Sequence, residues 1–545
     1  MKREGGKHGP DKRMIVAYVL LAVILFNAAF YAFTHYEGPS GYGDDSVYAS
    51  LAASALQGSF TESQGFIFSV RLLSFYPTAF FYLFGANTLT SSLFDILSYF
   101  GLIIIAFYFA KMFYSYKEGV ISAFLISIFP IVTKFAVNMG EDVPLTFVTS
   151  LAVVLFLYGE RGKQKWSYFL SGALIVAAWL ISYESGAAIA FLAVYALIEL
   201  ARKKIRIDKS SLFFVYGIVI ALLLTFIFSY FNSGFPFITI TENIRFYSAV
   251  GTVVNGLSTI PSTNVDLLFY PQAMFQYHLI SVLMHSSPTT LLGNIANTLF
   301  PKAAIEEYGL YFYLLVICAA VLLILRDRRS FFTLFWLAFL IAFLEFGPMD
   351  VLSLHPVALH YTLAYRLGRF MMITAVPLSA AIAMSLGKLL EFKNRYFLAF
   401  GSVVLVLILA LLYAQNTQIE NYWYQWQMYQ ESLAMQPAGF IRATAPNATV
   451  YLEEIVPNAG NIGYLSAFWV YLGSYKRYSD LQLVSNSINC SNIEQGSYIV
   501  WAGPPACGDW KNVFNVSVPS YIPQSIVSAE SFNLKWIITN VYYSG

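Results

Sequence analysis

The chain has 545 residues, of which 58% are hydrophobic and only 11% are charged. Soluble domains carry about 25% charged residues, so this composition excludes an ordinary soluble protein and indicates a protein that crosses a membrane several times. The 32 basic and 30 acidic residues leave a net charge of +2, which gives no sign of nucleic-acid binding.

Apolar stretches near the length of about 20 residues that a bilayer requires occur throughout residues 1–414. We predict an all-α polytopic domain there, with about eleven transmembrane helices and with external loops at 34–88 and 232–308. The first stretch is interpreted as a retained span because it is too long for a signal peptide and lacks a small-residue cleavage site. The expected spans are 14–33, 89–112, 118–137, 143–158, 167–182, 186–200, 211–231, 309–325, 331–346, 370–387 and 396–414.

Basic residues gather in alternate connections between these spans. This bias predicts a multi-pass protein of the cell membrane with a cytoplasmic N-terminus, because cytoplasmic connections are enriched in Lys and Arg. Six segments hold 21 of the 32 Lys and Arg residues, namely 1–13, 111–117, 161–165, 202–209, 326–329 and 388–395.

Residues 415–545 are predicted to form a separate extracytoplasmic domain, α/β or mostly β. The segments "ATVYLEEIV" and "SYIVWAG" alternate apolar and polar residues as strands do. The run "NYWYQWQMY" is interpreted as an aromatic belt at the membrane surface, with sugar stacking as the alternative. A single disulfide between Cys490 and Cys507 is possible. The three N-x-[ST] sequons of the chain, at Asn447, Asn489 and Asn515, all fall in this region.

Two acidic pairs occur in the predicted external connections. Asp44 and Asp45 begin a stretch with helical spacing of apolar residues, and Glu141 and Asp142 stand just before Pro144. Capping of helix N-termini is one interpretation, since acidic residues suit that position. A functional role is the other, because ionisable groups at a membrane boundary are costly and mark sites by default.

Three segments in chain order carry a family resemblance: "GDDSVYASLA", "YPTAFFYLFGAN" and "GEDVPLTF". They resemble the GT-C superfamily of polyprenyl-phosphate-sugar-dependent glycosyltransferases, and in particular the protein O-mannosyltransferases and the lipid A aminoarabinose transferases. The resemblance covers about residues 14–200 and is only topological beyond them.

The resemblance assigns roles to individual positions. Asp44, Asp45 and Tyr48 match the acidic pair and tyrosine that open the first external loop, with Asp45 in place of the family's Glu, and Asp142 matches an external Asp before a Pro. The aminoarabinose enzymes carry a Lys-Pro-Pro before the surface helix, which this chain lacks. Arg71 is the nearest base and is suggested as its substitute at the donor phosphate.

The chemistry of a lipid-phosphate sugar requires one general base. The phosphate is already a good leaving group, whereas a glycosidic bond needs two working carboxylates for hydrolysis. We expect Asp44 to take the proton of the acceptor hydroxyl, with Asp45 in reserve, which contributes typically about 10²- to 10⁴-fold. Asp142 is expected to orient the acceptor or the sugar, or to shift the pKa of the first acid by like-charge proximity.

Cations should lie where charge develops on the departing phosphate. Arg366 and Arg369, one helical turn apart, are expected to grip that phosphate, with headgroup contact as the alternative. The superfamily places an Arg shortly before a Pro-containing late span, which Arg369 and Pro377 match loosely. The remaining predicted substrate-binding residues are Tyr48, Arg71, Glu141, Arg245, His355 and His360.

The sequence thus predicts an inverting membrane glycosyltransferase. It would move a single sugar, mannose or another hexose, from a polyprenyl- or dolichyl-phosphate donor to a hydroxyl of a protein, glycan or lipid acceptor on the outer face, among membrane lipids. No cofactor and no metal are expected, because no H-E-x-x-H, C-x-x-C or phosphate-loop motif is present. The alternatives are an oligosaccharyltransferase, whose "WWDYG" signature is missing, a transporter or flippase, and an inactive scaffold.

Overall fold

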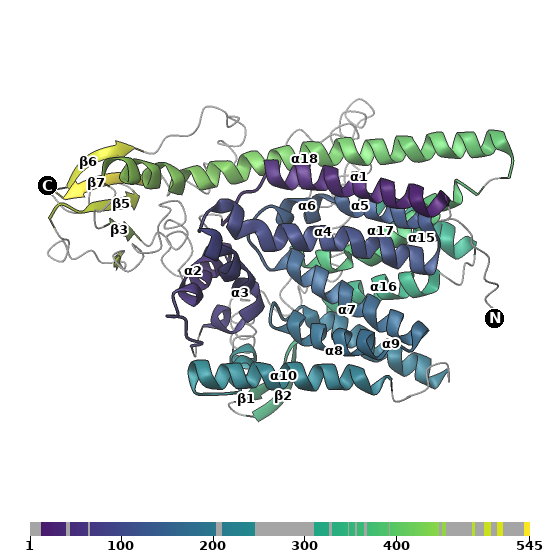
Figure 1. Ribbon diagram of the computed structural model, residues 1–545, viewed down its shortest axis with the longest axis horizontal. Coiled ribbons are helices and arrows are strands. Elements are labelled where there is room, and N and C mark those ends of the chain that lie inside the picture. Colours follow the sequence, from purple (N-terminus) through teal and green to yellow (C-terminus); the bar gives the residue numbers. More distant parts are fainter. Residues whose placement is uncertain are drawn as a thin grey trace, which may run out of the picture.

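A bundle of long, roughly parallel helices dominates the computed structural model (Figure 1). Its main members are α1 (Lys12–Thr34), α4 (Thr88–Phe113), α7 (Asp142–Gly162), α10 (Leu212–Ser233) and α17 (Ala375–Lys388). The structure describes residues 12–39, 44–63, 66–202, 210–245, 310–325, 330–346, 348–354, 357–363, 368–391, 393–445, 450–453, 482–484, 495–502, 510–515 and 539–544.

Each of the eleven predicted spans contains a helix in the structure, but the helices differ in length. Among the described residues, six helices are long and apolar enough to cross a membrane, or seven if one bent pair is a single span. The multi-pass prediction is therefore confirmed, while the number eleven stays a prediction. The shorter helices are α8 (Lys165–Trp179), α9 (Ser185–Ala201), α15 (Tyr311–Ile324) and α16 (Ser330–Phe346).

The bent pair replaces the predicted span 118–137. It consists of α5 (Tyr116–Ser127) and α6 (Pro130–Ala136), which meet at an angle of 59°. Pro130 explains the break, because proline has no N–H for the helix ladder and disfavours helical geometry in the residue before it. Phe129 is accordingly extended, with φ −79° and ψ 115°.

The first predicted external loop is largely helical. It contains α2 (Asp44–Leu56), η1 (Ile67–Val70), α3 (Leu72–Phe81) and η2 (Tyr82–Phe84), which lie together at one end of the bundle (Figure 1). Buried aromatic and small residues of α2 and α3 pack against each other there, so these short helices form a small core of their own.

Backbone hydrogen bonds tie the segment after α1 to the connection between α6 and α7. Glu37 N donates to Val137 O at 2.8 Å, and Met139 N donates to Gly38 O at 3.3 Å. Gly38 has φ +73°, and a Cβ on it would lie 2.9 Å from Thr88 Cα, so glycine is required here. The tie brings the two acidic pairs of the sequence to the same end of the bundle.

The last helix, α18 (Arg395–Thr444), is 50 residues long and continues through the predicted domain boundary at 414/415. The described strands that follow it are β3 (Val450–Glu453), β4 (Gln482–Val484), β5 (Tyr498–Ala502), β6 (Trp510–Asn515) and β7 (Thr539–Ser544). They form one sheet in the order β4-β3-β5-β7-β6, toward the end of the molecule that carries α2 and α3 (Figure 1).

The sheet is mixed: β3 runs parallel to β4 and β5, whereas β7 is antiparallel to β5 and β6. The predicted strands in "ATVYLEEIV" and "SYIVWAG" are β3 and β5, so both are confirmed. The domain as a whole stays a prediction. Cys490, Cys507, Asn447 and Asn489 lie outside the described residues.

One hairpin precedes the late span. Strands β1 (Pro348–Leu354) and β2 (Val357–Leu363) pair antiparallel between α16 and the short helix η4 (Gly368–Thr374), which leads directly into α17. Helix η4 therefore lies at the N-terminal end of α17, where the sequence predicted a cation.

Candidate functional site

Three of the predicted site residues meet at the α2–α3 end of the bundle. Arg369 Nη2 donates to Asp44 Oδ2 at 3.0 Å, and Arg369 Nη1 lies 3.7 Å from Asp142 Oδ2. Asp44 and Asp142 stand in the first turns of α2 and α7, and Arg369 is the second residue of η4. Segments up to 325 residues apart in the sequence thus converge on one guanidinium.

The three side chains differ in their access to solvent. Those of Asp44 and Arg369 are 35% and 28% exposed, whereas that of Asp142 is only 7% exposed. Asp44 can therefore meet a substrate, while Asp142 lies behind it. One guanidinium thus faces two carboxylates.

A second ion pair lies beside this cluster. Arg71 Nη1 contacts Glu141 Oε2 at 2.6 Å and donates to the Tyr48 hydroxyl oxygen at 2.9 Å, and the Tyr48 hydroxyl donates to Glu141 Oε2. All three residues are at most 7% exposed. Sequence analysis proposed substrate contacts for them, but the geometry favours a buried support that fixes α2, η1 and the start of α7 relative to one another.

Helix capping does not account for Glu141. It is the N-cap residue of α7, yet its side chain makes no capping hydrogen bond. Its carboxylate instead points to Arg71 and Tyr48. Asp142, one residue later, points to Arg369, so the second acidic pair divides between the two ion pairs.

Further buried acids surround the cluster. Burial raises the pKa of Glu37 well above its usual value, with the charge of Lys134 opposing and that of Asp45 adding to the effect. Burial likewise raises the pKa of Glu184 to about 7, helped by the charge of Glu141 and opposed by Arg71. Asp45 itself is 8% exposed, so it lies deeper than Asp44.

Sequence analysis did not assign Glu37, Asp95 or Glu184 to the site. Asp95, in α4, accepts a hydrogen bond from Gly140 N at 3.3 Å, and Glu184 lies between α8 and α9. The available signal was an acid immediately after an apolar span, which holds for Glu37. In the described parts of the chain, no group of three or more His, Cys, Asp or Glu is arranged to hold a metal ion.

Of the other predicted cations, Arg245 alone has a side chain that the structure describes. Arg245 pairs with Glu242 on its own helical turn at 3.7 Å and is largely exposed. His355 and Arg366 lie outside the described residues, and His360 lies in β2, where side chains are not described. Arg71 contacts Glu141, and Lys134 Nζ lies 3.3 Å from the centroid of the Trp423 ring.

Comparisons with known proteins give one partial family match. The sequence pattern of the family described as dolichyl-phosphate-mannose-protein mannosyltransferase matches residues 72–231. That segment runs from α3 to α10 and includes Glu141 and Asp142. A search of curated protein sequences gave no match.

Two solved structures share the fold at low identity. The apo ArnT of Cupriavidus metallidurans is 12% identical, with 97% of this chain and 98% of that chain covered and a TM-score of 0.50. The oligosaccharyltransferase of Archaeoglobus fulgidus in complex with Zn and sulfate is 14% identical, with 84% of this chain covered and a TM-score of 0.50. This chain spans 61% of the length of that oligosaccharyltransferase.

The match over residues 72–231 and the shared fold confirm the resemblance that the sequence motifs indicated. The chain is a multi-pass membrane protein with the GT-C fold, and it resembles the mannosyltransferases and aminoarabinose transferases of the GT-C glycosyltransferase superfamily.

Proposed function

We propose that the chain is an integral membrane glycosyltransferase that moves a single sugar from a polyprenyl-phosphate donor to an acceptor hydroxyl. The convergence of Asp44, Asp142 and Arg369 is the observation that carries this proposal. It joins an accessible carboxylate to a cation at one end of the bundle, which are the two groups that such a transfer requires.

Asp44 acts as the general base. The acceptor O–H transfers its proton to the Asp44 carboxylate while the oxygen forms a bond to the anomeric carbon. The bond between that carbon and the phosphate oxygen breaks, and its electron pair leaves with the lipid phosphate. Arg369 occupies Oδ2 of Asp44, so Oδ1 is the atom that receives the proton. A single displacement inverts the anomeric centre.

Arg369 binds the carboxylate of the base and also binds the phosphate of the leaving group. A guanidinium has five N–H donors, and among the described residues its one side-chain hydrogen bond goes to Asp44. Donors remain for the oxygens of a phosphate, whose charge grows as the bond breaks. Asp142, nearly buried behind Asp44, positions Arg369 and keeps it between the two carboxylates.

The remaining features of the substrate follow from the match and from the fold. The family pattern over residues 72–231 favours mannose or another hexose on a dolichyl-type carrier. The placement of α2, α3 and the C-terminal strands toward one end of the molecule supports a site on the outer face, opposite a cytoplasmic N-terminus. The acceptor is a hydroxyl of a protein, glycan or lipid, and no cofactor is required.

Transfer of radiolabelled sugar from polyprenyl-phosphate mannose to membrane acceptors tests the proposal. Asp44→Asn is expected to lower the rate by about 10²- to 10⁴-fold while the thermal unfolding midpoint stays unchanged. Glu391→Gln, an exposed carboxyl that pairs with Lys117 and Lys388, is the matched control and should transfer at the native rate. Native-rate transfer by Asp44→Asn would remove Asp44 as the base.

The donor series in the same assay separates the alternatives. Use of other polyprenyl-phosphate hexoses would change the sugar and leave the mechanism intact. The fold shared with an oligosaccharyltransferase favours one rival, a transferase of whole oligosaccharides. Transfer from a lipid-linked oligosaccharide in preference to the single-sugar donors would establish that rival, and no transfer from any donor would refute the enzyme assignment.

A further inference from the structure

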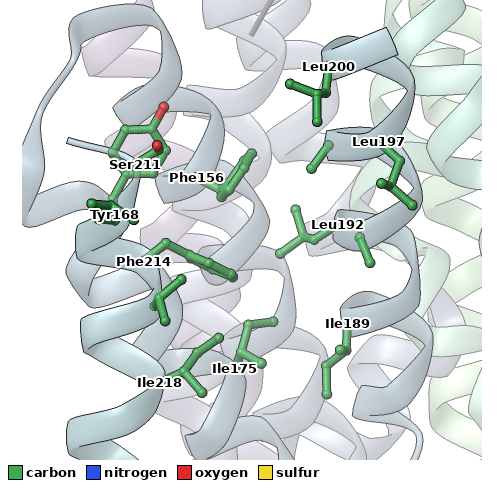
Figure 2. Close-up of a pocket in the computed structure, with 14 residues that line it drawn as sticks. Phe156, Tyr168, Ile175, Ile189, Leu192, Leu197, Leu200, Ser211, Phe214 and Ile218 are labelled. Carbon is green, nitrogen blue, oxygen red and sulfur yellow. The ribbon is translucent and has the colours of Figure 1, made fainter. Parts of the chain in front are cut away.

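An apolar groove lies between α9 and α10, with α8 and α7 behind it (Figure 2). Its volume is about 490 Å³, within the range of about 300–1,000 Å³ that ligand pockets occupy. In Figure 2, Ile189 to Leu200 of α9 line one side, and Ser211 to Ile218 line the other. Phe156 of α7 and Tyr168 and Ile175 of α8 complete the lining.

Glycines in two helices create the groove. A Cβ on Gly172 of α8 would lie 2.0 Å from Phe214 O, and a Cβ on Gly217 of α10 would lie 2.0 Å from Phe169 O. Backbone contact of this kind is how small residues bring membrane helices together. Helix α10 therefore sits directly on α8, and this position leaves the side toward α9 open.

The open side lies on the exposed surface of α9 and α10. Leu197 of α9 is 64% exposed and Val215 of α10 is 50% exposed, and both line the groove. Ser211 is the sole lining residue with a polar side chain besides Tyr168, and it stands at the same end as Leu200 (Figure 2). The groove thus suits a hydrocarbon chain with a polar group at the Ser211 end.

Cations collect at that end. Exposed Lys163 and Lys165 stand in the turn between α7 and α8 and at the start of α8, and exposed Arg202 is the C-cap of α9. Lys165 Nζ lies 5.4 Å from the ring centroid of Phe213, next to the groove. Two acids that the structure describes there already have partners: Glu199 pairs with Arg202 at 3.3 Å, and Glu160 accepts from the Tyr195 hydroxyl at 3.1 Å.

We propose that this groove binds an acyl chain of an anionic membrane phospholipid, whose phosphate lies at Lys165 and Arg202. The cations supply the charge complementarity, and the glycine-packed helices supply the slot. By the distribution of basic residues this end faces the cytoplasm, so the lipid comes from the cytoplasmic leaflet.

The donor of the proposed transfer is a different molecule at a different place. Phe156 follows Asp142 by 14 residues in the same helix, which places it about 21 Å along the axis from the Asp44–Arg369 cluster. A donor with its phosphate at Arg369 has its headgroup at the α2–α3 end of the bundle. The lipid in the groove has its phosphate at the opposite end, near Lys165 and Arg202.

Photo-crosslinking of the full chain in vesicles tests the site. Two probes would be compared, phosphatidylglycerol and phosphatidylcholine, each with a diazirine on one acyl chain. Each probe would be added in the same small amount to separate phosphatidylcholine vesicles, and the labelled peptides would be mapped by mass spectrometry. We expect the phosphatidylglycerol probe to label residues 189–200 and 211–218 in preference, by about fivefold for each cation engaged. Lys165→Gln with Arg202→Gln should bring this preference toward parity, whereas Arg395→Gln should leave it unchanged.

Filling the groove provides an independent arm. Ala193→Trp with Ala196→Trp should abolish labelling there, Ala196→Leu should reduce it partly, and Ala410→Trp on the exposed side of α18 should not affect it. The milder Leu variant keeps the test valid if the double Trp variant does not fold. Equal labelling by both headgroups, native labelling of the filled variants, or preferential labelling by a diazirine polyprenyl phosphate would overturn the proposal.

Discussion

Loss of the charge on Glu141 should destabilise the protein strongly, because Arg71 would remain charged and buried. The two groups are 2.6 Å apart, and their side chains are 8% and 4% exposed. At an effective dielectric constant of about 20, unit charges at that separation attract by about 6 kcal/mol before desolvation is subtracted. Removal of one partner of a buried pair costs about 3–5 kcal/mol, which is the loss we expect for Glu141→Gln.

The double variant Arg71→Met, Glu141→Gln sharpens this prediction. It removes both charges, so no ion is left buried, and it should recover most of the loss, with the hydrogen bonds to Tyr48 as the remaining cost. In the Glu141→Gln variant, the carboxylate of Glu184 would partly compensate the charge of Arg71 and so reduce the loss of stability. The two groups are close enough to interact, since the charge of Arg71 lowers the pKa of Glu184. Urea or thermal unfolding of the purified protein in detergent, followed by tyrosine and tryptophan fluorescence, measures the differences.

Activity of the double variant separates two roles for Arg71. As a buried support it can be replaced together with Glu141, so the folded double variant should keep sugar transfer within about tenfold of the native rate, since the reacting groups remain in place. As a ligand of the donor phosphate it could not be replaced. A folded double variant without measurable donor binding, or a Glu141→Gln variant as stable as the native protein, would refute the reasoning.

Three further predictions follow from the packing and the burial of single groups. Gly172→Ala should cost about 1–3 kcal/mol of stability, because its Cβ would meet the backbone of Phe214, whereas Gly439→Ala in α18, with nothing within 4 Å, should be neutral or stabilising in the same unfolding experiment. Burial raises the pKa of Glu62 to about 7, so the folded state holds a proton that the unfolded state releases between pH 4.5 and 7. The free energy of unfolding should therefore fall by about 3 kcal/mol as pH rises through that interval and level off above it. The Glu62→Gln protein should lack this pH dependence in thermal scans at a series of pH values. Trp423→Ala should lose about 1–2 kcal/mol by removing the ring over Lys134, and Trp423→Phe should lose less than half of that in denaturant unfolding.

The sequence predicted the helical architecture well because bilayer-length apolar runs are a strong signal. Helix α4 begins and ends within one residue of the predicted span 89–112, and α7 begins one residue before the predicted span 143–158. The break at Pro130 was visible in the residues but lay inside an unbroken apolar run. The continuation of α18 through residue 414 was not visible, since polar and aromatic residues on an exposed helix have no strong pattern of their own.

The convergence of three side chains at the candidate site was predicted for a similar reason. The residues concerned are ionisable and lie at the ends of apolar segments: Asp44, Asp142 and Arg369. Such positions can be recognised from the linear sequence alone. The pairing of Arg71 with Glu141 depends on α2, η1 and α7 meeting in space, which no local pattern encodes. Glu37 belongs to the same surroundings only because the Gly38–Asn138 bridge folds the chain back on itself.

Helix α18 is a long helix that runs from the bundle to the C-terminal sheet. At 50 residues it is about 75 Å long, more than twice the thickness of a hydrocarbon core, and Phe440 near its end stacks on Phe514 of β6 with ring centroids 4.8 Å apart. A rotation of the C-terminal end of α18 would therefore change the orientation of the sheet. Insertion of one residue after Gln425 would move the strands by about 1.5 Å along the helix axis and turn them by about 100°, so the helical phase of α18 governs the orientation of the sheet relative to the bundle.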